Sequence, residues 1–247
     1  MGRLTRTLLV LAAVIVIALA AWFGMGFFVA PATGPVKSQV REVSDFNTLK
    51  VDGRGTVVIR VDDKPALRVE AKESVLERLQ THVDGQVLSL HERWGWMGVA
   101  FLFGDPKITY YVTVPTLSSI DLSGSIVIGT EGVLAADKLS IDTSGSSNVT
   151  ISVNTSSLTL DCSGSSDVDL SGTVDNLVIE ASGSTDVQAR ELVTRIATID
   201  CSGSSDIHLN VSELLTVKMS GSSNVTYLGN PQLNTDLSGS GRVRAVQ

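Results

Sequence analysis

Seven copies of a Ser-Gly-Ser element divide the second half of this 247-residue chain into short units of similar length. Their central glycines are Gly124, Gly145, Gly164, Gly183, Gly203, Gly221 and Gly239. The spacings between these glycines are 21, 19, 19, 20, 18 and 18 residues. Self-similarity at such a period is typical of folds in which each unit stacks on the one before it. The repeat therefore predicts an elongated stack with about 19 residues per coil.

Apolar and polar residues alternate on both sides of each glycine. Two positions before it stand Leu122, Thr143, Cys162, Ala181, Cys201, Met219 and Leu237, and four positions after it stand Ile128, Val149, Val168, Val187, Ile207, Val225 and Val243. A period of two is that of a strand with one face inward. Glycine permits a tight corner, and small serines let corners pile up about 4.8 Å apart, each hydroxyl within reach of its neighbour.

These patterns predict an all-β fold: a right-handed, single-stranded parallel β-helix, or solenoid. Its handedness follows from the general preference of parallel crossover connections. Residues 120–247 form its repeat coils, and residues 46–119 form an irregular first half of the same domain.

The irregular first half has β character with a weaker period. Strands are expected at Val51 and at residues 57–61, 67–71, 87–90 and 108–114, with turns at Asp52-Gly53, Asp62-Asp63 and Asp84-Gly85. Only residues 73–81 resemble a helical turn or two. This short segment is expected to cap or cross one end of the stack.

An uncharged, apolar segment at residues 7–30 precedes the β domain. It exceeds the roughly 20 residues needed to cross a bilayer core. Arg3 and Arg6 precede it, so the positive-inside rule keeps the N-terminus in the cytoplasm and exports the rest. We expect one N-terminal transmembrane signal-anchor over residues 1–30 and a linker over 31–45. A cleaved signal peptide is the alternative, because residues 18–20 and 30–32 have the small-x-small form of a cleavage site.

The overall charge excludes one class of partner. A net charge of −7 opposes the attraction to phosphate backbones that supplies most non-specific nucleic-acid affinity. We therefore expect no nucleic-acid partner.

Two ladders of polar residues follow from the repeat. Three positions before the glycines lie Asp121, Asp142, Asp161, Glu180, Asp200, Lys218 and Asp236, and three positions after them lie Asn148, Asp167, Asp186, Asp206 and Asn224. Stacked carboxylates either coordinate Ca²⁺ from adjacent rungs or act as turn-closing and solubilising groups. The second interpretation is preferred, since the Gly-Gly-x-Gly calcium signature is absent. We expect no metal and no cofactor.

The sequence offers no distinct catalytic centre. It has no Gly-x-Ser-x-Gly elbow, and His82, His91 and His208 lack the spacing of a metal or triad pair. A glycoside hydrolase needs two carboxyl groups at a defined separation, whereas regular ladders specify no unique pair. We expect a protein that is not an enzyme, with a polysaccharide-acting enzyme as the alternative.

One aromatic segment stands outside the repeat. Trp94, Trp96, Phe101 and Phe103 lie in a glycine-broken apolar loop between two expected strands. Such a cluster indicates either an interaction patch for a membrane or partner, or a cap over an open solenoid end.

The chain from residue 46 onward resembles the head GIN domain family of auto-transporter adhesins. The resemblance rests on Phe46-x-x-Leu49-x-Val51-x-Gly53, on residues 57–59 and 83–88, on Val112-Thr113-Val114-Pro115-x-Leu117-x-x-Ile120, and on the Ser-Gly-Ser repeats. It implies a β-solenoid of the bacterial cell envelope with an adhesin-like role and no catalytic residues. No barrel-like segment is recognised after the repeats, which is a departure from a self-transporting adhesin.

Together these features predict an exported, membrane-anchored, adhesin-like binding or structural module of the bacterial cell envelope. Its expected partners are the membrane through residues 7–30 and a surface glycan or protein ligand. A regulatory envelope protein is a further alternative. The ligand and the oligomeric state are left open.

The two cysteines, Cys162 and Cys201, are expected to remain unbridged. Both stand two residues before their glycine, with Ala181 on the rung between them. Two rungs separate the Cα atoms by roughly 9.6 Å, beyond the roughly 7 Å that a disulfide spans. We expect two buried free thiols.

Overall fold

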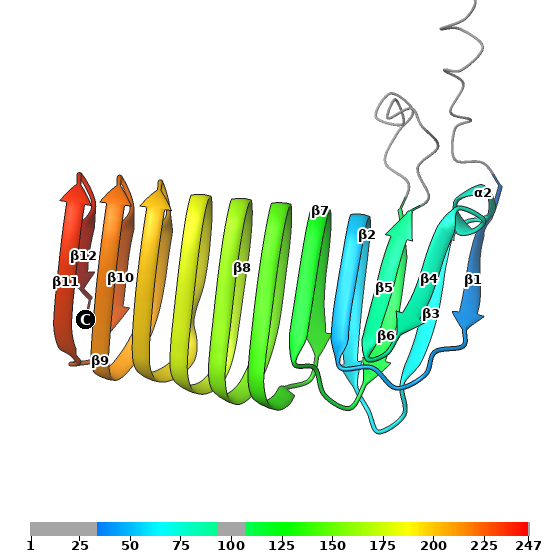
Figure 1. The fold of residues 1–247 in the computed structure, drawn as a ribbon, viewed down its shortest axis with the longest axis horizontal. Helices are drawn as coiled ribbons and strands as arrows, with labels where there is room; N and C mark the ends of the chain where they lie inside the picture. The colour runs from blue at the N-terminus through cyan, green and yellow to red at the C-terminus, as the bar shows by residue number, and fades with distance from the viewer. Residues whose placement is uncertain (1–33, 93–106, 247) are drawn as a thin grey trace, which may run out of the picture.

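The computed structural model describes residues 34–92 and 107–246, which are almost entirely β-strand (Figure 1). The elements are β1 (Val36–Arg41), β2 (Thr48–Val61), β3 (Ala66–Lys72), α2 (Glu73–Leu76), β4 (Leu79–Asp84), β5 (Val87–Glu92), β6 (Thr109–Val114), β7 (Ser119–Glu131), β8 (Leu134–Gly203), β9 (Asp206–Gly221), β10 (Asn224–Leu228), β11 (Gln232–Gly239) and β12 (Arg242–Ala245). The prediction of an all-β fold is confirmed. No helix within the described ranges has the length and apolar character needed to cross a membrane.

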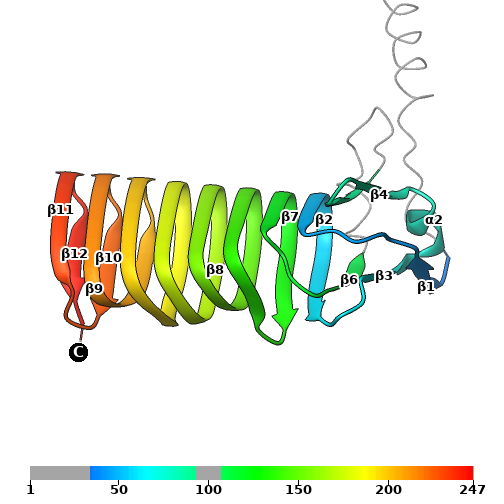
Figure 2. The same ribbon diagram turned by 60° about the horizontal axis from the view of Figure 1, so that its bottom comes forward.

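One open sheet connects all of these strands. Along its main path, β2, β7, β8, β9, β10 and β12 pair in parallel. The register aligns the repeats, because Gly124 pairs with Gly145 and Gly203 pairs with Gly221. Figures 1 and 2 show the chain completing one turn per repeat, with each turn lying beside the one before it. Each such turn is called a rung from here on. The handedness of this winding stays a prediction.

The repeat glycines form corners that no other residue fits. Gly164, for example, has a φ of +116°, and a Cβ added there would lie 2.4 Å from the carbonyl oxygen of Gly145. The serine hydroxyls of the corner meet the expectation only in part. Ser163 Oγ donates to the carbonyl oxygen of Thr143 on the preceding rung at 3.2 Å, rather than to a neighbouring hydroxyl. Ser166 Oγ, in the same corner, lies 3.2 Å from Thr143 Oγ1 on the preceding rung, so backbone and hydroxyl partners both stabilise the corner.

The core is a set of apolar columns running along the stack. Side chains two positions before each glycine and four positions after it are buried through most of the stack, as the alternation predicts. Cys162 and Cys201 have no exposed surface and are both free in the structure. The predicted burial of the two thiols is confirmed.

One rung of the first half differs from the prediction. Asp52-Gly53 was expected to be a turn between two strands, but β2 runs through it without a break. Gly53 has a φ of +125° and pairs with Gly124, so it is a corner of the same kind as the repeat glycines. No serine flanks Gly53, so the Ser-Gly-Ser pattern does not extend to this corner.

The end of the stack near β1 is built differently from the rest. There β1 pairs with β3, β3 with β6, and β4 with β5, all antiparallel. The helix expected over residues 73–81 is only the four-residue α2, because Leu79 is buried and pairs with Glu92 at the start of β4. In Figure 1 this short helix lies at that end, as expected for a cap.

Two expectations concern the chain before β2. The predicted linker over 31–45 contains β1, whose Val36 to Arg41 pair with β3, so a strand occupies part of that segment. The predicted anchor at residues 7–30 lies outside the described residues.

Candidate functional site

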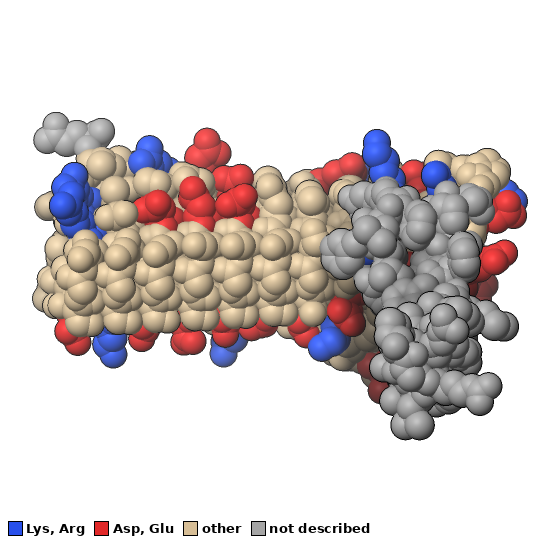
Figure 3. Space-filling view, turned by 90° about the horizontal axis from the view of Figure 1, so that it is seen from above, with Lys and Arg blue, Asp and Glu red and all other residues tan. Residues whose placement is uncertain are grey.

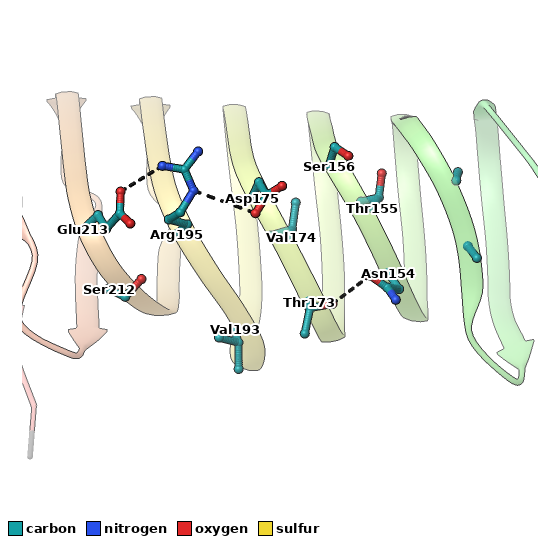
Figure 4. Close-up of a pocket in the computed structure, with 12 residues that line it drawn as sticks. Asn154, Thr155, Ser156, Thr173, Val174, Asp175, Val193, Arg195, Ser212 and Glu213 are labelled. Atoms are coloured by element: carbon teal, nitrogen blue, oxygen red, sulfur yellow. Dashed lines mark hydrogen bonds and ion pairs between the residues drawn. The ribbon is translucent and has the colours of Figure 1, made fainter.

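A shallow groove of about 640 Å³ runs along one side of the stack, across five neighbouring rungs (Figure 4). β8 supplies the first four of these rungs and β9 the fifth. The lining residues are Ala135, Ala136, Asn154, Thr155, Ser156, Thr173, Val174, Asp175, Val193, Arg195, Ser212 and Glu213. At about 4.8 Å per rung, the groove spans roughly 19 Å from first rung to last.

The groove is hollow because its side chains are small where it begins. Ala135 and Ala136 form one end, and Ser156 follows on the next rung. Thr155 and Val174 are buried beneath them and form the floor. Thr155 is held there because its Oγ1 donates to the carbonyl oxygen of Asp137 at 3.0 Å.

An irregularity in the β-ladder shapes the other end of the groove. Thr194 pairs with Val211 and Ile196 pairs with Leu214, so two residues of β9 oppose the single Arg195 of β8. Such a bulge redirects side chains locally. Here it places the carboxylate of Glu213 within 2.8 Å of Arg195 Nη1.

The polar groups of the groove are already ordered by contacts between rungs. Arg195 lies between two carboxylates. Its Nη1 is 2.8 Å from Glu213 Oε2, and its Nε is 3.8 Å from Asp175 Oδ1. Thr173 Oγ1 donates to Asn154 Oδ1 at 2.9 Å. Figure 4 shows these side chains spread along successive rungs, so amide, hydroxyl, carboxylate and guanidinium groups line one continuous track.

The charge of this track restricts what it can bind. Two carboxylates accompany one guanidinium, and both carboxylates are engaged by it. An anionic ligand would meet a lining of net charge −1. The groove is therefore better suited to an uncharged ligand with many hydroxyl or amide groups.

The predicted ladders of acids are present along the stack, but cations interrupt the first one. Lys50 precedes Asp121 and bonds to its Oδ2 at 2.7 Å, and this hydrogen bond raises the pKa of Lys50. Lys218 lies in register between Asp200 and Asp236. Within the described part of the chain, no group of three or more His, Cys, Asp or Glu side chains has an arrangement that could hold a metal ion.

The second ladder follows the corners and is closed by side-chain amides. Asn224 Nδ2 donates to Asp206 Oδ1 at 2.8 Å, and Gln188 Nε2 donates to Asp186 Oδ1 at 2.6 Å. Figure 3 shows the corner face from above as an uncharged band bordered on both sides by charged side chains, most of them acidic and some basic. This face offers regular small groups but no hollow.

The aromatic residues selected from the sequence cannot be compared with the groove. Trp94, Trp96, Phe101 and Phe103 lie outside the described residues. The groove itself was missed by sequence reasoning, although its small residues recur about midway between repeat glycines. That signal is faint because alanine, serine and threonine are common on any exposed strand.

Comparison with known families gives a match over most of the chain. The family profile described as "Putative auto-transporter adhesin, head GIN domain" matches residues 45–231. A search of curated proteins found no match.

Solved structures with a similar fold include proteins of Bacteroides and Parabacteroides species. A putative adhesin of Bacteroides fragilis has a TM-score of 0.80 at 22% identity, covering 88% of this chain and 100% of its own. A putative lipid binding protein and a putative adhesin, both of Parabacteroides distasonis, have TM-scores of 0.67 and 0.64, each at 17% identity and covering 88% of this chain and 99% of their own. At these identities the likeness establishes the fold alone.

Proposed function

Because this chain belongs to the head GIN domain family of putative auto-transporter adhesins, we propose that it is a non-catalytic adhesin-like module that binds an extended, uncharged glycan in the groove. The observation that carries this proposal is the ordered polar track across five rungs. Sugar hydroxyls both donate and accept hydrogen bonds, and the amide, carboxylate and guanidinium groups of the track offer both kinds of partner.

We further propose where the module lies in the cell and how its chain winds. The module is a right-handed solenoid held at the bacterial cell envelope by the apolar segment 7–30, with the β domain outside the cytoplasm. The adhesin-like family supports a place at the cell surface. Charge placement and segment length support the anchor.

A polysaccharide-cleaving enzyme is a weaker candidate for this groove. A glycoside hydrolase places two carboxyl groups on either side of the scissile bond. Asp175 and Glu213 instead lie on either side of Arg195, which contacts both. This geometry supports binding of a glycan without its cleavage.

The groove proposal is tested with the full chain in detergent micelles on an array of neutral and acidic glycans. Arg195→Met removes the guanidinium and keeps most of the side-chain volume. Loss of a hydrogen bond to a charged group is expected to weaken neutral-glycan binding about tenfold or more. Arg60→Met is the matched control, because Arg60 is also an arginine paired with a carboxylate, that of Glu131, and lies outside the groove.

Two outcomes contradict the proposal. The first is an array on which no neutral glycan binds the wild-type chain. The second is an Arg195→Met variant that binds as tightly as the Arg60→Met control.

A further inference from the structure

The end of the stack farthest from β1 presents two unpaired strand edges. β11 pairs only with β9, and β12 pairs only with β10, so within the described chain the outer edge of each strand has no neighbour. A row of unpaired N–H and C=O groups is a template for adding another strand. Figure 1 shows both edges at the same end, with the two strands running in opposite directions.

Apolar side chains are uncovered at this end. Leu233 and Leu237 are 41% and 46% exposed, whereas Leu215 and Met219, their partners one rung below, are 0% and 4% exposed. The same inward columns are thus closed inside the stack and open at its end. Edge strands that are protected from pairing with another chain often carry charged side chains, whereas this edge carries exposed leucines.

The charges beside this edge have opposite signs on the two strands. Asp236 stands three residues before Gly239, and Arg242 stands three residues after it, so the two lie level on the two sides of the corner. Both side chains are exposed. Like charges at an edge repel a second copy, whereas this arrangement attracts one in a defined orientation.

We propose that this end binds the same end of a second copy of the chain through a two-fold axis. An axis along the strand direction, between β11 and β12, places β11 of each copy antiparallel to β12 of the other. Asp236 of each copy then meets Arg242 of the other, so the contact forms twice, as an isologous interface requires. The exposed leucines are covered by the inward columns of the partner.

The opposite end of the stack does not fit as the partner. β1 has the sequence VKSQVR, whose charged residues are cations only. Lys37 is already ion-paired with Glu73 at 2.6 Å, and Arg41 Nη1 already donates to the carbonyl oxygen of Leu79 at 2.8 Å, so neither is free to pair with Asp236. A head-to-tail contact of that kind would also continue into a filament instead of closing as a dimer.

The end-to-end dimer has a functional consequence that rests on the proposed membrane anchor. The two β1 ends lie at opposite poles of the dimer, so two anchors would be held apart by two full stacks. Such a pair joins two membranes, which makes the second ligand of this adhesin-like module another copy of itself.

The test uses the full chain in detergent micelles, with its mass measured by sedimentation over a range of concentrations. The wild type is expected to form a dimer. Asp236→Arg and Arg242→Asp each place like charges at both contacts and should weaken dimerisation about a hundredfold or more. An equimolar mixture of the two variants restores both opposite-charge contacts and should dimerise again. Asp161→Arg, at the same position of a middle rung, is the control and should dimerise like the wild type.

Recovery in the mixture also shows that both variants are folded. A wild type that stays monomeric at 100 times the concentration used for the glycan measurements, an open series of larger species, or a dimer unaffected by both variants would each overturn the proposal. Glycan binding is read separately with Arg195→Met, so loss of one activity does not imply loss of the other. Vesicles bearing wild-type chain should cluster, and dimers in micelles without clustering of vesicles would contradict the anchoring part.

Discussion

At the scale of single residues, the buried thiols show how register overrides a common inference. Two cysteines in an exported chain usually pair. Here Cys162 and Cys201 belong to one inward column, and Gly183, in the rung that carries Ala181, stacks between the corner glycines Gly164 and Gly203. Both side chains are fully buried, so they behave as small apolar core residues.

Burial of these thiols predicts a pH dependence. Desolvation raises the pKa of both, that of Cys201 to about 12 from an ordinary 9.0. The pKa of Cys201 is higher in the folded chain than in the unfolded chain. Its protonated thiol therefore contributes fully to the free energy of unfolding below pH 9, and this contribution is lost as the pH rises toward 12. We expect no thiol to react with a thiol-specific reagent at pH 8 in the folded chain, and two to react after unfolding. An intramolecular disulfide found by mass spectrometry would show that this reasoning from register is wrong.

At the scale of elements, the unit that stabilises this protein is the rung, and glycine stacking sets its spacing. Parallel pairing follows from the repeat, since each rung must return to the same position above the last. The antiparallel strands at the β1 end were not distinguished from parallel ones by sequence, because a period of two is common to both. The corner at Gly53 was likewise not recognisable from the sequence, because no serine flanks this glycine although it pairs with Gly124.

Replacing Gly164 with alanine tests the importance of this stacking. The new Cβ would lie 2.4 Å from the Gly145 carbonyl oxygen, and the φ of +116° is strained for any residue with a side chain. We expect Gly164→Ala to lower the free energy of unfolding by about 3 kcal/mol or more. Denaturant unfolding of the full chain in detergent measures it.

Gly129→Ala is the control for this substitution. The nearest atom to its Cβ would be the Thr150 carbonyl oxygen at 3.7 Å, an ordinary contact, and its φ is not positive. The free energy of unfolding should change by less than about 1 kcal/mol. Equal effects at Gly129 and Gly164 would contradict the stacking argument.

At the scale of the whole molecule, the stack separates three features. The groove lies on its side over β8 and β9, the exposed leucines lie at the β11 and β12 end, and β1 lies at the other end. β1 begins at Val36, six residues after the predicted anchor ends at Ala30. Six residues reach at most about 20 Å, so the β1 end is expected to lie close to the membrane.

The anchor can be tested in cells. The full chain is expected to remain in the membrane fraction after alkaline washing, and protease added on the side of the membrane away from the cytoplasm should digest the β domain. A variant without residues 7–30 should stay in the cytoplasm. A mature soluble form beginning near Thr33 would show that the segment is a cleaved signal peptide.

The sequence by itself determined the rung. Its length, its inward columns and its glycine corners are all local consequences of a period of two interrupted by a residue that tolerates positive φ. Residues such as Ile141 and Val149 could be assigned to the core for this reason alone, and both are buried.

Only the tertiary structure decided the groove and the open end. Arg195 and Glu213 are 18 residues apart in sequence, and their contact depends on where the bulge between β8 and β9 shifts the register. Likewise, Leu237 occupies the same column as buried Met219 and has the same alternation around it. Leu237 is exposed because in the described chain no further rung lies above it. Whether a column is covered depends on stacking between residues that are distant in sequence, and a local sequence pattern carries no information about that stacking.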